Sequence, residues 1–159
     1  MVSVSHPHSG VSCGARLTRE PDLTGISHSL PLRVYYEDTD TAGIVYHANY
    51  LKFAERGRSE MLRSLGFPHR RLGAEEGVGF AVRRAAVEYL APARLEDALT
   101  VVTTLTGVGA ATLSARQEIR REGELLADID LLVACIGRDG RPRRLPSALR
   151  AALSRRETP

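Results

Sequence analysis

A single change of hydrophobic period constrains the fold of this chain most strongly. Apolar or small residues recur every three to four positions from Tyr46 to Leu65, which predicts an amphipathic helix. From Val78 to Cys135 apolar residues alternate with polar ones instead, which predicts a succession of strands. One long helix and several strands bury their apolar sides together when the helix packs against a sheet. The sequence therefore predicts an α+β domain.

The order of the predicted elements follows from where these patterns begin and end. A first strand is expected in the β-branched and aromatic run from Pro31 to Glu37. The later strands are expected at residues 78–89, 99–105, 113–119 and 125–135, and the segment SALRAAL, residues 147–153, predicts a short helix. We expect about five strands, of which the last four form an antiparallel meander.

Local signals refine these elements. The small pair Ala54 and Gly57 on the apolar side of the helix predicts a close approach to the sheet, and Gly66 predicts the helix end. The alternation changes phase at Arg83 and Arg84, which predicts a β-bulge. The outer face of the last strand is expected to be mixed, with Leu126, Leu132 and Ile136 beside Asp128 and Asp130.

Length and composition fit one domain. A chain of 159 residues with 43% hydrophobic content can bury a core of its own. Residues 1–30 have no sustained period and are expected to be a disordered extension, residues 31–154 the folded domain, and residues 155–159 a tail. Cys13 and Cys135 lie too far apart in sequence and setting to indicate a disulfide framework, which favours the cytoplasm. No apolar run predicts membrane insertion or a signal peptide.

The charge is mildly basic and rests almost wholly on arginine. The formal net charge is +3, and Lys52 is the only lysine. Arginine suits phosphate because its planar fork binds two oxygens at once. Aromatic residues make up only 5% of the chain, and no basic helix or stacking motif is present, so nucleic acid binding is not predicted.

The stretch YYEDTDTAGIVYHANY, residues 35–50, concentrates chemistry where the first strand ends and the helix starts. Glu37, Asp38 and Asp40 place three acids within four residues, and the helix is expected to begin near His47. The first N–H groups of a helix have no intrahelical partner and carry partial positive charge. A carboxylate facing them across a bound carbonyl would make a small hydrolytic site. Gly43 permits the close backbone approach such a site needs.

The acidic cluster also fits roles that involve no such hydrolytic site. Acids before a helix commonly form turns and caps. A calcium-binding EF-hand loop beginning at Asp38 would have its required glycine at Gly43 but fails at two places. Ala42 stands where an oxygen ligand is needed, and Asn49 stands where the glutamate is needed. A phosphatase of the haloacid dehalogenase type, with Asp38 as the nucleophile, needs a downstream lysine, and none follows Lys52. No metal site is predicted.

A longer resemblance joins these motifs. The string RVYYEDTDTAGIVYHANYLKFAERGRSEMLRSLG, with VRRAAVEYLAPARLED and RPRRLP downstream, resembles acyl-CoA thioesterases of the 4-hydroxybenzoyl-CoA thioesterase type. Within them it is most similar to the bacterial branch associated with the Tol-Pal system, over about Pro31 to Leu153. The resemblance implies a hotdog fold, in which an antiparallel sheet wraps a long helix. It also implies a homodimer or homotetramer whose sheets join edge to edge, with each active site at the interface.

The resemblance also assigns roles within the motif. It implies that Asp40 is the catalytic carboxylate and that the backbone N–H at His47 polarises the thioester carbonyl. We assign substrate contacts to Tyr36, Gly43, Val45 and Tyr46. Acyl-CoA is the implied substrate, acyl carrier protein thioesters are a second class, and no cofactor is implied. Candidates for binding the CoA phosphates are Arg83, Arg84, Arg116, Arg143 and Arg144.

Three functions stay open from the sequence. The leading one is hydrolysis of acyl-CoA, because the thiol leaves readily and one carboxylate can suffice as general base or as nucleophile. The second is a hotdog module that binds acyl-CoA without turnover. The third is the magnesium-dependent phosphatase that would use Asp38.

Overall fold

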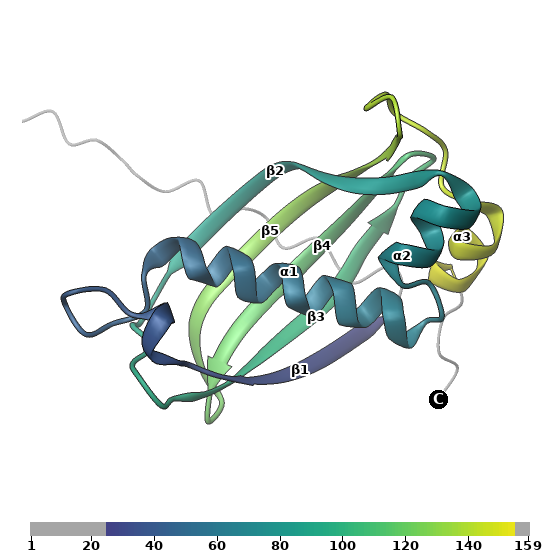
Figure 1. Ribbon diagram of the computed structural model, residues 1–159. Helices are drawn as coiled ribbons and strands as arrows, with labels where there is room; N and C mark the ends of the chain where they lie inside the picture. Colours follow the sequence, from purple (N-terminus) through teal and green to yellow (C-terminus); the bar gives the residue numbers. More distant parts are fainter. Residues whose placement is uncertain (1–24, 155–159) are drawn as a thin grey trace, which may run out of the picture.

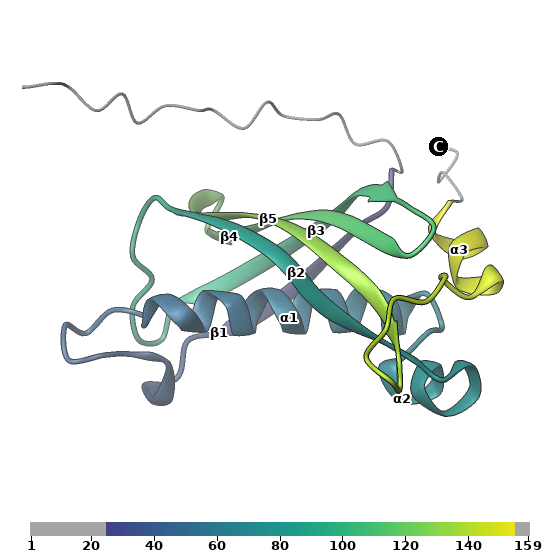
Figure 2. The same ribbon diagram turned by 90° about the horizontal axis from the view of Figure 1, so that it is seen from above.

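The computed structural model describes residues 25–154, which form one five-stranded antiparallel sheet and one long helix across it. The helix α1 lies along a single face of the sheet (Figures 1 and 2). The strands are β1 (Ser27–Arg33), β2 (Val78–Tyr89), β3 (Ala98–Val108), β4 (Thr112–Arg121) and β5 (Glu124–Gly137), and the main helix is α1 (His47–Ser64). This arrangement is the predicted α+β architecture.

The strand order differs from the expected meander. The sheet runs β1-β3-β4-β5-β2, so only β3, β4 and β5 follow one another as neighbours. Strand β2 pairs with β5 at one edge, and β1 pairs with β3 at the other. The chain therefore crosses the whole sheet through α1 between β1 and β2 (Figure 1). The expected place of β2 in the meander is wrong, because periodicity identifies strands but not their partners.

The first strand begins earlier than predicted. It covers Ser27–Arg33 in place of Pro31–Glu37, and all seven of its residues pair with β3 in continuous register. Tyr36–Asp38 form a 3-10 turn, because the backbone N–H of Tyr35 donates to the Asp38 carboxylate at 2.9 Å and the chain turns there. The folded domain therefore includes Ser27 and the residues after it, and the boundary expected at residue 31 is placed too late. Residues 1–24 of the expected extension and the tail at 155–159 lie outside the described residues.

Helix α1 approaches the sheet closely, as the small residues predicted. Phe53 and Ala54 are fully buried, and Gly57 faces β3 and β4. A Cβ atom on Gly57 would lie 2.8 Å from Val101 Cγ1 and 2.9 Å from Thr103 Oγ1. The helix ends shortly before Gly66, whose positive φ of 86° turns the chain away.

A buried polar network fastens α1 to the sheet. The Gln117 amide on β4 is fully buried and donates to the Ala54 carbonyl at 2.8 Å and to Thr103 Oγ1 at 2.7 Å. Its oxygen accepts a hydrogen bond from the Arg58 guanidinium at 2.6 Å. Because every polar group of the Gln117 side chain has a partner, its burial fixes the position of the helix on the sheet.

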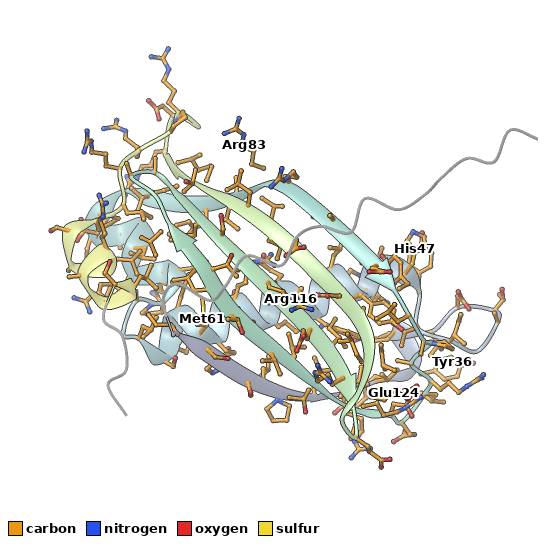
Figure 3. All side chains as sticks on the ribbon, turned by 180° about the vertical axis from the view of Figure 1, so that it is seen from behind. Tyr36, His47, Met61, Arg83, Arg116 and Glu124 are labelled. Atoms are coloured by element: carbon orange, nitrogen blue, oxygen red, sulfur yellow. The ribbon has the colours of Figure 1, made fainter. Side chains whose placement is uncertain are left out.

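The sheet has three register shifts, and two of them bear on predicted residues. The register of β2 against β5 shifts between Val82 and Arg84, so the predicted bulge is confirmed, and Arg83 projects from this edge (Figure 3). A second shift, where Ile119 gives way to Arg120 on β4, turns Leu126 inward. Leu126 was expected on the outer face, and it is fully buried in the core.

Short helices close the end of the domain opposite the start of α1. The helix α2 (His69–Arg71) and a π-helical turn (Leu72–Glu76) join α1 to β2, and neither was predicted. The predicted terminal helix is α3 (Ser147–Leu153), which buries Leu149 and Leu153. Among residues 25–154, no helix combines the length and apolar character needed to cross a lipid bilayer.

Candidate active site

The start of α1 presents unpaired backbone donors. The helix begins at His47, as predicted, with no side-chain cap and no acidic residue in its first turn. The N–H groups of Tyr46 and Asn49 donate to the carbonyls of Asp38 and Tyr46. Within the described part of the chain, the N–H groups of His47 and Ala48 have no acceptor. This helix end can therefore stabilise an oxygen on which negative charge develops.

Asp38 holds the turn before the helix together. The residue is only 4% exposed, and its carboxylate accepts the Tyr35 N–H. Its carbonyl accepts hydrogen bonds from Tyr46 N and from Asn49 Nδ2, both at 2.9 Å. A carboxylate so placed forms a cap and a turn and does not face solvent, so the structure gives Asp38 a structural role.

Asp40 lies on a small hairpin that leads directly into α1. Thr39 and Val45 form a bridge, and Asp40 N donates to the Ile44 carbonyl at 2.9 Å. One oxygen of the Asp40 carboxylate accepts the Ala42 N–H at 2.8 Å. The side chain is exposed, and its other oxygen makes no hydrogen bond to the described residues. Asp40 thus offers a solvent-facing carboxylate on the segment that ends at the helix start.

The hairpin and the segment before β3 support each other. Val45 N donates to the Ala93 carbonyl at 2.9 Å, and Ala93 N in turn donates to the Tyr50 hydroxyl at 2.9 Å. Burial raises the pKa of Tyr50, so its hydroxyl keeps its proton and orders this segment. The Asp97 pKa is lowered, because hydrogen bonds from the Arg94 N–H and the Arg121 guanidinium outweigh the effect of burial. The base of the hairpin is therefore firmly held.

His47 lies among aromatic rings at the helix start. Its ring is exposed, with its centroid 4.4 Å from that of Tyr46 and 6.4 Å from that of Tyr89. The Tyr89 hydroxyl donates to the His47 carbonyl at 3.0 Å, and burial raises the Tyr89 pKa. This contact ties the end of β2 to the first turn of α1. No hydrogen bond or ring contact of the described residues joins His47 to Asp40.

Sequence reasoning missed three residues of this site, namely Asn49, Tyr50 and Tyr89. In the hydrophobic pattern, Tyr50 and Tyr89 count only as apolar members of a helix and a strand. Tyr50 is buried, and the need of its hydroxyl for a hydrogen-bond partner is the signal that could have found it. Tyr89 is 47% exposed, and no such signal marks it in the sequence. An asparagine in the first turn of a helix is the corresponding signal for Asn49.

The residues predicted to contact substrate differ in accessibility. Tyr36 is 83% exposed and Tyr46 is 46% exposed. Figure 3 shows Tyr36 and His47 at the same end of the molecule. Gly43 has a positive φ of 72° at the hairpin turn, with open space around it. The left-handed backbone of the turn, and no close contact, explains why a glycine stands there. Val45 is buried in the core, which leaves only its backbone available.

Comparison with known proteins assigns the family. A model of the family described as Thioesterase-like superfamily matches residues 34–153, which include the hairpin, the start of α1 and all of β2 to β5. The chain belongs to this superfamily. Its five-stranded sheet with a long helix across one face is the hotdog fold, and the membership removes the phosphatase alternative.

Relatives within the superfamily carry thioesterase names. The acyl-CoA thioester hydrolase YbgC of Escherichia coli O6:H1 is 46% identical over 121 residues, which cover 75% of this chain and 90% of the relative. The solved structure of a probable thioesterase from Bartonella henselae is 39% identical with a TM-score of 0.74, covering 76% and 100% of the two chains. A 4-hydroxybenzoyl CoA thioesterase mutant bound to 4-hydroxybenzoyl CoA has a TM-score of 0.75 at 22% identity, covers 80% and 99%, and shows the fold alone.

The arginines predicted to bind CoA phosphates differ in whether an acidic side chain already pairs with them. Arg116 lies on the outer face of the sheet and binds both oxygens of Asp128, at 2.8 and 2.5 Å (Figure 3). Its charge is already neutralised there. Arg143 lies 4.0 Å from Asp139. Arg83, Arg84 and Arg144 form no ion pair with the described residues.

Proposed function

We propose that this chain hydrolyses acyl-CoA thioesters to a free acid and CoA. Asp40 is the reacting carboxylate, and the backbone N–H of His47 donates a hydrogen bond to the thioester carbonyl. The observation that carries the proposal is the uncapped start of α1, with two unpaired N–H groups, directly after a hairpin that presents a free carboxylate. The relatives named as acyl-CoA thioesterases support the substrate class. Reduced Cys135 favours the cytoplasm as the compartment.

The chemistry needs few groups. As a general base, Asp40 takes a proton from water while the resulting hydroxide attacks the thioester carbon. The carbonyl oxygen gains negative charge, which the N–H of His47 stabilises, and the C–S bond then breaks to release CoA thiolate. As a nucleophile, the carboxylate instead forms an anhydride that water hydrolyses. A thiol with a pKa of about 8.5 leaves as thiolate without a strong acid.

The active unit we propose is a dimer joined through β2. This edge strand is 12 residues long, contains no proline and exposes Val82 and Tyr89. The opposite edge, β1, has seven residues and contains Pro31, which cannot donate to a partner strand. Pairing two β2 edges would continue the sheet across both copies.

The purified protein should elute at no less than twice the 17.3 kDa mass of one chain. Pairing through β2 covers an edge that otherwise exposes backbone groups to solvent. Light scattering coupled to gel filtration measures the mass, and turnover is assayed in the same fractions. A monomer that hydrolyses acyl-CoA at full rate would contradict the dimer.

His47→Ala should lower turnover by about tenfold or less, because the substitution keeps the backbone N–H that faces the carbonyl. The measurement is kcat for wild type and variant across a range of pH. The helix should persist, since alanine is a strong helix former.

A side-chain role for His47 makes a different prediction. If the imidazole orients water or protonates the leaving thiolate, His47→Ala loses about a hundredfold or more in kcat. One limb of the pH profile would disappear together with that loss. This combined result would overturn the backbone role while leaving thioester hydrolysis intact.

Acyl carrier protein thioesters present the same carbonyl and the same kind of thiol leaving group. The same two groups of the site would serve them. Parallel turnover of one acyl group carried by CoA and by acyl carrier protein decides between the carriers. Tight binding of acyl-CoA with no release of acid from either carrier would instead identify the chain as a binding module.

A further inference from the structure

Asn49 is the only asparagine of the chain, and it lies in the first turn of α1. The chain has one other side-chain amide, Gln117, and both residues are buried, with exposed fractions of 5% and 0%. The Gln117 amide nitrogen donates to the Ala54 carbonyl in the middle of α1. The Asn49 amide nitrogen donates instead to the Asp38 carbonyl, 11 positions earlier in the sequence, at 2.9 Å. Gln117 therefore holds the helix on the sheet, whereas Asn49 joins the helix start to the hairpin that carries Asp40.

The Asp38 carbonyl is the point at which the hairpin and the helix meet. It accepts hydrogen bonds from the Tyr46 N–H and from the Asn49 amide, both at 2.9 Å. The Tyr46 N–H closes the base of the hairpin and belongs to the main chain. In the part of the chain that the structure describes, Asn49 makes the only side-chain hydrogen bond from α1 to residues 38–46. Because Asp40 follows two residues after Asp38, this bond determines where the reactive carboxylate lies relative to the helix start.

A second link between the hairpin and α1 is indirect. Val45 N donates to the Ala93 carbonyl, and Ala93 N donates to the Tyr50 hydroxyl of α1, both at 2.9 Å. This link passes through the segment before β3 and does not involve Asn49. Loss of the Asn49 hydrogen bond should therefore displace the hairpin without unfolding it.

The amide group of Asn49 also keeps the helix start free of negative charge. An acid is common at the third position of a helix, where it accepts N–H groups and is favoured by the helix dipole. Helix α1 has Asn49 at this position and no acid in its first turn. A carboxylate there could not donate to the Asp38 carbonyl, and its charge would lie close to the unpaired N–H groups of His47 and Ala48. Negative charge beside these donors would oppose the charge that develops on the thioester oxygen.

We propose that Asn49 is a positioning residue for the hydrolysis, which acts through the Asp38 carbonyl to hold the Asp40 carboxylate in place relative to the N–H of His47. The inference rests on the proposed thioesterase function. Asn49 touches no reacting atom in this assignment. Misplacement of a catalytic group by about 1 Å can lower a rate by about a hundredfold. The effect of Asn49 on turnover should therefore pass through Asp40.

Asn49→Ala removes the amide donor and should lower kcat for acyl-CoA hydrolysis by about tenfold or more. Thr103→Val is the matched control, because Thr103 is fully buried and accepts a hydrogen bond from Gln117 in the network that fastens α1 to the sheet. Each variant loses one buried hydrogen bond, so thermal melting should place both somewhat below wild type. Thr103→Val should keep kcat within about twofold of wild type. An equal loss of kcat in the two variants would show general loosening of α1 and overturn the positioning role.

Asn49→Asp is the second variant and serves also if Asn49→Ala folds poorly. Aspartate has nearly the size and shape of asparagine, but its carboxylate cannot donate to the Asp38 carbonyl. It also places a negative charge in the first turn of α1. The kcat of Asn49→Asp should therefore fall at least as far as that of Asn49→Ala. Wild-type kcat in a folded Asn49→Asp protein would contradict the proposal.

A double-mutant cycle tests the route through Asp40. In Asp40→Asn protein, the further change Asn49→Ala should lower the residual kcat by about twofold or less, because the carboxylate that Asn49 positions is already gone. A merely structural role would lower the residual kcat by the same factor as it lowers that of wild type. That equal loss in both backgrounds would overturn the positioning role, even if Asn49→Ala alone were strongly impaired.

The outcomes separate the inference from the function on which it rests. Wild type that hydrolyses no acyl-CoA would defeat the proposed function and the role of Asn49 with it. An active wild type that loses turnover in Asp40→Asn but keeps its full kcat in Asn49→Ala would defeat the role of Asn49 alone. Loss of turnover in Asn49→Ala, no loss in Thr103→Val and no further loss in the double variant is the result that supports it.

Discussion

Asp40→Asn lowers kcat for acyl-CoA hydrolysis by about a hundredfold or more, because the amide can act neither as base nor as nucleophile. The fold should be unchanged. The side chain is exposed, and its one hydrogen bond, from the Ala42 N–H, can pass to the amide oxygen. Steady-state turnover with an acyl-CoA and a thermal melt of the same samples measure both effects.

Neighbouring acids provide matched controls for this substitution. Glu37→Gln removes an exposed charge three positions away and should leave kcat within about twofold. Asp38→Asn keeps an oxygen that can accept the Tyr35 N–H, so it should affect turnover less than Asp40→Asn. Wild-type turnover in Asp40→Asn, or a dominant loss in Asp38→Asn, would refute the assignment of the carboxylate.

Gly57→Ala destabilises the domain, although alanine normally stabilises a helix relative to glycine. The added Cβ would lie 2.8 Å from Val101 Cγ1 and 3.1 Å from Gln117 Nε2, and Gln117 is held by its own hydrogen bonds. Overpacking of this kind costs about 1–3 kcal/mol. In a domain of this size, Tm should fall by about 3–10 °C.

Gly73→Ala is the control for Gly57→Ala. It also places a methyl group on a helical glycine, but nothing lies within 4 Å of that Cβ. Its Tm should stay equal to wild type or rise slightly, since alanine restricts the unfolded chain. Differential scanning calorimetry of the three proteins makes the comparison. If Gly57→Ala melted no lower than Gly73→Ala, the close packing of α1 on β3 would be disproved.

Features set by neighbours in sequence were predictable. The start of α1 at His47, its end before Gly66 and the bulge beside Arg83 each depend on a few consecutive residues. The close approach of Gly57 to the sheet was predicted for the same reason, because small residues mark that side of the helix. Helix caps, glycine stops and changes of alternation are local properties of the chain.

Features set by distant partners were not predictable. Nothing within β2 indicates that it joins β5 at the far edge of the sheet. The inward turn of Leu126 depends on a register shift in β4, and the contact between Tyr89 and His47 joins residues 42 positions apart. For the site, the resemblance singled out Asp40 over Asp38, and the fold adds what the sequence did not predict, that Asp38 is buried and Asp40 is exposed.

The carboxylate of Asp40 that we propose to react makes no contact that holds the domain together. The hairpin is anchored at its base, through Val45 and Ala93, while the carboxylate that we propose to react touches only its own turn. An inactive Asp40→Asn protein should therefore remain as stable as wild type and keep its substrate site. Such a protein could bind an acyl-CoA and keep it intact. Mixed with intact acyl-CoA, it would hold the thioester uncleaved for long enough to crystallise, and the density of the acyl group would reveal which chains the enzyme accepts.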